Sequence, residues 1–384
     1  MAFAQGSRSG LSIQAETTFG VAPGSPQLVQ IPYNTHSLGL TKDRVQGNDI
    51  LPDRMNRVDR HGNRKAGGDI VVDLRKYDYD ALMESVFMSS FTTATTLATS
   101  AATSAAGTAT ITFPVQGSAP FPVGSKIIVA GVTPTGFNGT WTVTACTTTT
   151  VQFLNGTAGP QTVAGTVGLA NTLKIGTTLK SFYIEDAATD IAQYRLFSGM
   201  SVSSLAVSIK PNQMTTGTFS MVGKDMTISG TSFDAAKDAM STNAPFDAYS
   251  GTMKISDAGG SLAAIASITG IDFTVNNNFV PTFVVGSAST PQLEYGKATV
   301  EGTITAYFED ATLINRFINE TATKFEVAIN DPTGSNPYTW LFPNVKINAA
   351  DVPVGGPTSR VISLPFVALY DTTFATNIQL TRTS

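Results

Sequence analysis

The chain has 384 residues, of which 14% are charged, and its formal net charge at pH 7 is −4. This length corresponds to about two or three domains and can bury a substantial core. The acidic balance excludes a polybasic nucleic-acid binder, because phosphate binding requires clustered Lys and Arg side chains. Abundant Gly, Thr, Ser, Ala and Val residues favour β-strands joined by turns over helices.

The N-terminal residues 1–10 contain no basic region followed by an apolar run, so we expect no signal peptide. No stretch of the sequence reaches the roughly 20 apolar residues that span a bilayer. We therefore expect a soluble chain that is made in a cytoplasm and has no membrane partner.

A dense group of charges occupies residues 41–69. Acidic residues alternate there with the cations Arg44, Arg54, Arg57, Arg60, Arg64 and Lys65. The simpler interpretation is a solvated loop, but nearly a third of the chain's Lys and Arg residues lie in this segment, too many to pair easily within one loop. We therefore favour an arm that docks on another copy of the chain, where alternating charges set register more than affinity.

Residues 66–87 have a counterpart in residues 300–317. Both stretches begin with alternating apolar and polar residues, as in a half-buried strand, and continue into a short helix. The matched strand residues, at a constant offset of 234, are Gly68 with Gly302, Ile70 with Ile304 and Leu74 with Phe308. The helices share one apolar stripe, formed by Leu82, Met83, Val86 and Phe87 in the first and by Leu313, Ile314, Phe317 and Ile318 in the second. Asp80 and Asp310 are the predicted N-caps.

A second match, between Tyr194 and Tyr338, has an offset of only 144, so the first copy carries about 90 residues that the second lacks. These residues, 91–177, are rich in Thr, Ala, Gly and Val, and Lys126 is the single charged residue among 91–171. Strand-like runs separated by turns such as Asn138-Gly139 predict a small inserted β-domain of Ig-like type. Insertion into a surface loop costs little free energy.

The predicted organisation is a first domain of residues 1–90 and 178–235, an insert of residues 91–177 and a second domain of residues 236–384. Each full domain is expected to be mostly sheet with one short helix, so the fold class is all-β, or α+β by strict count, with two tandem β-sandwich or barrel domains. In the second copy, the nearly uncharged residues 274–298 take the place of the charged arm. Two arms of different charge at equivalent positions predict that each arm contacts a different neighbouring molecule.

Catalytic signatures are missing from the sequence. His36 and His61 belong to no catalytic or metal-binding motif, and neither has a counterpart in the second copy. The single cysteine, Cys146, is better explained as a half-buried strand thiol than as a nucleophile, and it excludes an internal disulfide framework. Gly-rich and acidic turns lack the spacing of phosphate or calcium sites. We therefore expect no enzyme, no metal site and no cofactor.

Several short stretches resemble, in their order along the chain, the major tail tube proteins of siphophages. They are AETTFGVAP (15–23), ITGIDFTVNNNFVPTFVVGS (268–287), VEGTITAYFEDATLINRFIN (300–319), LFPNVKI (341–347) and VGGPTSRVISLPFVALYD (354–371). The resemblance covers nearly everything outside the insert, which resembles the small Thr-rich β-domains that decorate many phage virion proteins.

The resemblance implies a structural protein of the phage tail, assembled in the host cytoplasm. Subunits of that family form rings whose sheets join edge to edge into a closed barrel, which removes exposed strand edges. Two copies per chain imply that three chains complete a pseudo-sixfold ring, with a six-chain ring of larger girth as the alternative. The implied partners are further copies of the chain, the tape measure protein, the tail terminator and the distal tail proteins.

The resemblance also implies that double-stranded DNA slides through the bore without binding, for which a negative or neutral wall is suited. Alternation places Asp69, Asp73, Asp272 and Glu301 opposite the apolar residues of their strands, so they are candidates for the lumen; the alternative is an ordinary solvated strand face. The insert is expected to project outward. Its residues Phe121, Phe137 and Trp141 either form a stacking surface or pack in the core of the insert.

Three other classes compete with a tail tube subunit. An adhesin or fibre protein would predict export signals or coiled-coil segments, and neither occurs. A β-sandwich carbohydrate hydrolase needs two carboxylates about 5–10 Å apart and an aromatic groove, but the carboxylates are scattered and only two tryptophans exist. A head–tail joining or capsid decoration protein of the same virion is the nearest alternative.

Overall fold

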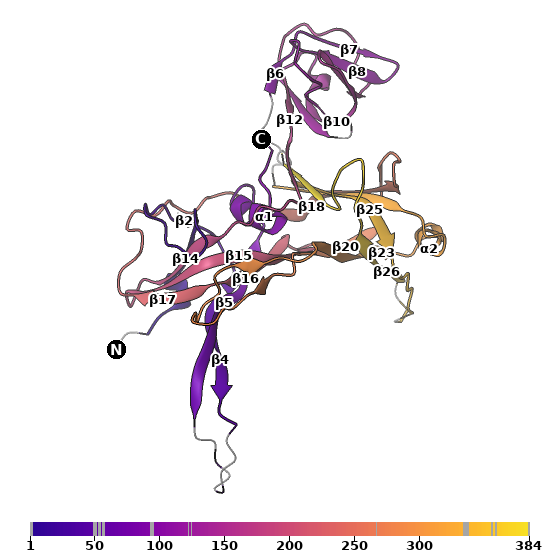
Figure 1. The fold of residues 1–384 in the computed structure, drawn as a ribbon. Coiled ribbons are helices and arrows are strands. Elements are labelled where there is room, and N and C mark those ends of the chain that lie inside the picture. The colour runs from indigo at the N-terminus through magenta and orange to yellow at the C-terminus, as the bar shows by residue number, and fades with distance from the viewer. Residues whose placement is uncertain are drawn as a thin grey trace.

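The computed structural model describes residues 3–382, except 49–51, 53–54, 56–57, 93–95, 122, 124, 266, 333–337, 355 and 358. Antiparallel strands dominate these residues, which contain two short α-helices, α1 (Asp80–Phe87) and α2 (Thr312–Ile318), and two 3-10 turns, η1 (Gly6–Arg8) and η2 (Thr135–Phe137). The prediction of an all-β fold is confirmed. In Figure 1 the main body is elongated and layered, the insert stands above it, and a long hairpin projects below it.

Nine strands form what we call the first half of the body. They are β1 (Ser9–Ala15), β2 (Val29–Gln30), β3 (Thr35–His36), β4 (Gly39–Gln46), β5 (Asp59–Asp73), β14 (Phe182–Ala188), β15 (Gln193–Ile209), β16 (Thr216–Gly223) and β17 (Asp225–Ser229). The strands pair in the order β1–β14–β15–β16–β5–β4, and β17 pairs with the N-terminal part of β15.

The second half of the body contains the remaining strands of the large sheet except β13, and a small hairpin. They are β18 (Asp247–Asp257), β19 (Ala263–Ala264), β20 (Ile268–Asn276), β21 (Val280–Pro281), β22 (Leu293–Glu294), β23 (Thr299–Tyr307), β24 (Thr323–Asn330), β25 (Tyr338–Ile347), β26 (Val361–Ala368) and β27 (Gln379–Arg382). The order β18–β24–β25–β26–β23–β20, with β27 on the N-terminal part of β25, repeats the pairing order of the first half.

The two halves meet in a seam. Residues 204–209 of β15 pair with residues 271–276 of β20, so the two sheets continue into one another. A single hydrophobic cluster runs through both halves and includes Phe219 of the first half and Phe325 of the second. The body is therefore one continuous structure, in which strands of both halves form one sheet over a shared core.

The insert has a sheet and a core of its own. Its strands are β6 (Thr96–Ala98), β7 (Ala101–Ala105), β8 (Thr108–Thr112), β9 (Lys126–Ala130), β10 (Gly139–Cys146), β11 (Thr150–Leu154) and β12 (Thr166–Leu169). The next strand, β13 (Asn171–Lys174), lies within the predicted insert but pairs with β27, and its Leu173 belongs to the core of the body.

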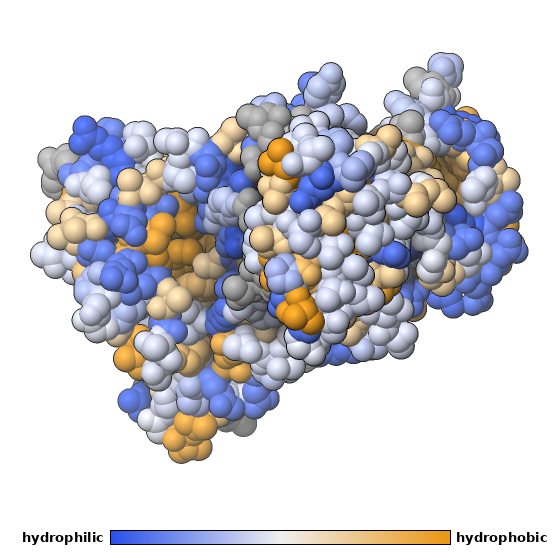
Figure 2. Space-filling view, turned by 90° about the horizontal axis from the view of Figure 1, so that it is seen from above, coloured by the Kyte–Doolittle hydropathy of each residue, from blue (hydrophilic) through white to orange (hydrophobic). Residues whose placement is uncertain are grey.

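Seen from above, the surface of the molecule is mostly hydrophilic, with separate small hydrophobic patches (Figure 2).

The register between the halves differs from the sequence match by one residue. When the ladders are followed outward from β5 and β23, the offset between β15 and β25 is 145 and not 144. This offset aligns Phe197 with Phe342, which are both buried. The match of Tyr194 with Tyr338 is wrong, because a slip of one residue puts side chains on opposite faces of a strand.

The two helices differ in capping and in burial. The N-cap of α2 is Ala311, one residue after the predicted Asp310, although Asp310 Oδ1 accepts a hydrogen bond from Thr312 N, the first helical residue, at 2.7 Å. The prediction for Asp80 is wrong, because Asp80 is the first helical residue and its Oδ1 accepts a hydrogen bond from the Tyr338 hydroxyl. All four apolar stripe residues of α1 are buried, whereas only Leu313 is buried in α2.

Candidate assembly surfaces

One solvent-facing side of the large sheet carries all four acidic residues that were predicted for the lumen. Strands β5, β16, β15, β20, β23 and β26 lie side by side, and alternate residues of each point into the core. We call the opposite, solvent-facing side the polar face. One of its rows runs across the six strands through Asp73, Thr216, Ser208, Asp272, Thr303 and Pro365.

The four predicted lumen residues all lie on the polar face. Asp69 and Asp73 are four residues apart on β5, and Asp272 lies in the same row as Asp73. Glu301 lies opposite Thr274, two residues along β20 from Asp272. Directly paired residues of neighbouring strands point to the same side of a sheet, so the four carboxylates share one surface. Asp272 and Glu301 line one hollow, at the seam.

The charge of the polar face is negative or neutral near the seam. Ser208 Oγ donates a hydrogen bond to Asp272 Oδ1, and Lys210 Nζ lies 3.4 Å from the same oxygen. Within the described part of the chain, no Lys, Arg or His nitrogen lies within 4 Å of the carboxylate of Asp69 or Glu301. Glu301 and Lys346 lie on either side of Val367 in one row across the sheet, and Lys346 Nζ lies 2.8 Å from Glu320 Oε2.

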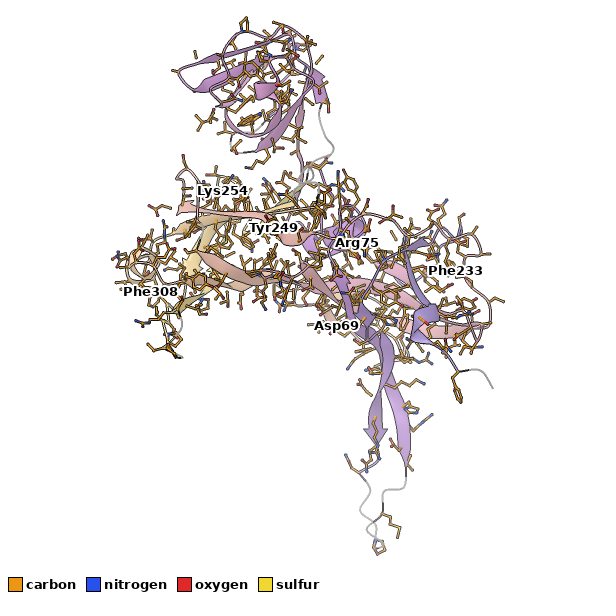
Figure 3. The ribbon with its side chains drawn as sticks, turned by 180° about the vertical axis from the view of Figure 1, so that it is seen from behind. Asp69, Arg75, Phe233, Tyr249, Lys254 and Phe308 are labelled. Atoms are coloured by element: carbon orange, nitrogen blue, oxygen red, sulfur yellow. The ribbon has the colours of Figure 1, made fainter. Side chains whose placement is uncertain are left out.

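The charged segment is a β-hairpin that projects from the body (Figures 1 and 3), which we call the arm. Its strands are β4 and the N-terminal part of β5. Arg44 pairs with Asp59, and Lys65 Nζ lies 3.1 Å from Asp43 Oδ1, so both ion pairs cross the hairpin. The expectation that the cations of this segment cannot easily pair within it is therefore wrong for Arg44 and Lys65. Their ladder partners are His61 and Thr41, and the acidic residues two positions from those partners, Asp59 and Asp43, lie diagonally across the hairpin within reach.

The other predicted arm residues differ from one another. Arg64 Nη1 reaches Asp225 Oδ2 on β17 at 3.1 Å, which fixes the base of the arm. Arg60 lies opposite Val45 and is exposed. Arg54 and Arg57 lie outside the described residues.

Residues 277–298 lie against the arm of the same chain. Arg64 N donates to Ala288 O at 2.7 Å, and Lys65 Nζ lies 5.7 Å from the centroid of the Phe283 ring. This segment thus supports the base of the arm, a contact that the sequence pattern did not indicate.

The aromatic residues predicted as insert surface lie mostly in its core. Phe121 and Phe137 are fully buried, so a stacking surface built on them is wrong. Trp141 is half-buried and stacks on Phe153 with ring centroids 5.2 Å apart, and its Nε1 donates to Phe137 O. The three side chains fill the small sheet's interior, because a domain of this size has few other large apolar residues.

Sequence reasoning missed one contact between the insert and the body. Lys126 Nζ, from β9, lies 3.1 Å from Glu326 Oε2 on β24, and Lys254 Nζ lies 3.6 Å from the other carboxylate oxygen. Glu326 is buried. The signal was that Lys126 is the one charged residue in a long uncharged stretch.

The histidine and cysteine residues form no catalytic arrangement in the described structure. His36 Nε2 lies 3.5 Å from Asp186 Oδ1, and Arg195 pairs with the other oxygen. Burial raises the pKa of Asp186, but the hydrogen bond from His36 and the charge of Arg195 outweigh it, so the net pKa is lowered. Burial raises the pKa of the Cys146 thiol, which keeps it protonated and a poor nucleophile.

These surfaces belong to a β-rich protein whose described residues hold no metal-binding group of three or more His, Cys, Asp or Glu side chains. The chain belongs to the phage tail tube protein family, because the model of that family matches residues 6–368. A search of curated proteins found no match. Membership makes the chain a structural component of the bacteriophage tail, in a family that assembles itself into a tube with other tail proteins. None of the described helices has the length and apolar character needed to cross a membrane.

Proposed function

We propose that this protein is the major tail tube subunit of a siphophage, and that three copies close each ring of a hollow tube that conducts double-stranded DNA to the host cell. The observation that carries this proposal is the repeated strand pairing, β1–β14–β15–β16–β5–β4 in the first half and β18–β24–β25–β26–β23–β20 in the second. Two equivalent halves supply two of six sectors, so three chains complete a circle.

The seam supports a mode of ring closure. Within the chain, residues 204–209 have β16 on one side and β20 on the other. The bulge between Val202 and Ser204 lowers the offset between the halves to 144 at Ser204, because Asn348 lies opposite Pro365 as Ser204 lies opposite Ser220. The corresponding residues 348–353 touch β26 through Asn348 and Asp351, and no described strand lies on their other side. At the far end of the sheet, β3 and β4 pair only with β5 among the described strands. Pairing residues 348–353 with β3–β4 of the next copy would repeat the seam and close the sheet into a barrel without edges.

The same division assigns roles to the parts of the chain. Residues 1–90 and 178–235 are one tube domain and residues 236–384 the other, and the separate sheet and core between Thr96 and Leu169 support an insert within 91–177 that decorates the outside. The domain pair is the product of a duplication.

The polar face suits the wall of the bore. Its Thr and Ser side chains and its four carboxylates offer phosphate groups no array of cations, so DNA passes without being held. In a closed barrel this face would line the inside, because the opposite face is buried in the core.

The arm suits a contact between stacked rings, because it extends well beyond the body and carries charges of both signs. The proposed partners of the tube are the tape measure protein, the tail terminator and the distal tail proteins. Assembly takes place in the host cytoplasm.

Negative-stain microscopy of the purified protein tests this function. Long hollow tubes are the expected result. Isolated rings would favour a head–tail joining protein, and single particles that bind only to capsids would favour a decoration protein. Either outcome, or fibres without a bore as in an adhesin, would overturn the proposal.

A further inference from the structure

The second helix carries an apolar surface that its counterpart buries. Phe317 and Ile318 of α2 are 37% and 64% exposed, whereas the corresponding Val86 and Phe87 of α1 are fully buried. The two stripes have the same spacing along their helices, so the difference arises from what lies beside each helix.

The cover of α1 comes partly from β15 and β13, which pack against it, and partly from the second half of the chain. The ring of Phe87 lies 6.2 Å from that of Trp340 on β25. Asp80, at the start of α1, accepts a hydrogen bond from Tyr338 of β25 and pairs with Arg382 of β27. Asn277 Nδ2, from the segment after β20, donates to Val86 O at 2.7 Å. The first helix is thus part of the contact between the halves.

The positions of the helices explain the difference. In Figure 1, α1 lies in the middle of the body, where the halves meet, and α2 lies at the outer end of the second half. The opposite end of the body carries β17 and the N-terminal part of β15, and Figure 3 shows the same separation from behind, with Phe308 and Phe233 at opposite ends. No described element of the same chain covers α2 in the way that β25 and β27 cover α1.

The strand register identifies the counterpart of that cover. Trp340 pairs with Leu380 of β27, and the equivalent pair in the first half is Arg195 with Ile228 of β17. Ile228 is 64% exposed, and β17 pairs with no described strand other than β15. The first half therefore offers β15 and β17 at its outer end, and these are the counterparts of the strands β25 and β27 that contact α1 in the middle of the body.

We propose that Phe317 and Ile318 of α2 dock on β15 and β17 of a second copy of this chain, so that the contact between copies repeats the contact of α1 with β25 and β27. The proposal rests on the proposed ring function and names the surface that joins its copies. The occupant follows from continuity with the contact inside the chain, since only the first half of another copy presents the matching strands.

Charge placed on this surface tests the contact. The double variant Phe317→Asp/Ile318→Asp is expected to keep the circular dichroism spectrum of the wild type and to remain monomeric by light scattering, with at least a tenfold loss of tubes under the microscope. Ile228→Asp changes the β17 side of the same proposed contact, and this variant is expected to behave in the same way. Leu154→Asp is the matched control, because Leu154 is also 64% exposed but lies in the insert.

A photo-cross-link locates the partner independently of assembly yield. Benzoylphenylalanine at position 318, in a mixture of nitrogen-15-labelled and unlabelled chains, is expected to join peptides of different label and to map to residues 193–198 or 225–229. Cross-links that stay within one chain, or that map elsewhere, would overturn the contact. If the wild type forms tubes and the aspartate variants form as many, the contact is overturned but the proposed function is not. If the wild-type chain forms no ring or tube, both the proposed function and the contact are overturned.

Discussion

Ser208 and Asp272 lie directly opposite each other across the seam, and Ser208 Oγ donates a hydrogen bond to Asp272 Oδ1. The two residues come from strands that are 64 positions apart in the sequence and belong to different halves of the body. This joint shows how the two halves meet edge to edge within one chain, and the proposed joint between chains is expected to follow the same pattern.

The polar face is expected to bind DNA when lysine residues are introduced on it. Glu301→Lys tubes should assemble normally but bind double-stranded DNA, because each added cation contacts phosphate, with log K falling by about 0.9 per contact for each tenfold rise in salt. The measurement is DNA retention by purified tubes at several salt concentrations, followed by ejection rates from phage particles.

Two lysine variants separate position from charge. Thr303→Lys adds one cation to the polar face, and Thr144→Lys adds one to the exposed surface of the insert. Only the first should retain DNA. Normal ejection and infectivity from particles with Glu301→Lys or Thr303→Lys would contradict the assignment of this face to the bore.

The insert is expected to be dispensable when it is cut at the right residues. Replacing residues 96–169 by a short Gly-rich linker should leave tubes intact, because their sheet and core are separate from the body. Removing 91–177 also deletes β13, and the loss of buried Leu173 alone should lower the free energy of unfolding by about 2–5 kcal/mol. Urea unfolding compares the two deletions, and failure of the shorter deletion to form tubes would contradict an outward, non-structural insert.

The arm is expected to join rings and not to build them. Replacing residues 43–63 by an Asn-Gly turn keeps the pair of Lys42 with Arg64 and should give rings that no longer stack into long tubes. Microscopy measures tube length. The charge-swapped variant Arg44→Asp/Asp59→Arg keeps the cross-strand pair and serves as a control with a complete hairpin. Tubes of full length from the shortened chain would rule out this role for the arm.

Asp186 gives the first half a pH-dependent stability. Its pKa in the folded chain is below the ordinary value of 3.8, so its stabilising effect is complete above that value and is lost as the pH falls through the lowered folded-state pKa. Asp186→Asn should lower the free energy of unfolding at pH 7 by about 1–3 kcal/mol, toward the lower end because Arg195 is partly exposed.

Chemical unfolding of the unassembled chain between pH 7 and pH 3 checks this sign. The difference between Asp186→Asn and the wild type should shrink below about pH 4, and a difference that is constant with pH would show that the carboxylate charge is not the cause. Glu309→Gln removes an exposed carboxylate and is the matched control.

Local patterns in the sequence were enough to predict the strands of the polar face and the separate insert. Strict alternation around Ile70, Ile271 and Ile304 fixes which residues of a strand share a face, so the four carboxylates could be placed together before any coordinates. The nearly uncharged composition of residues 91–171 likewise indicated a segment with its own core.

Contacts between distant segments were beyond such patterns. The acidic partners of Arg44 and Lys65 depend on the register of a hairpin with a bulge between Lys42 and Arg44, which composition does not reveal. Burial of Phe121 and Phe137 depends on how seven short strands close around them. The unequal burial of the two helical stripes depends on where the halves meet, and identical spacing cannot encode that position.

The number of chains in each layer of the assembled tube tests the central claim most directly. A helical reconstruction from electron cryomicroscopy, at a resolution that separates strands, traces individual chains around the ring. The account predicts three chains per layer, with the two halves alternating around the bore and β15–β20 seams alternating with joints between residues 348–353 and β3–β4. Six whole chains per layer, or a ring in which only one half faces the bore, would contradict it.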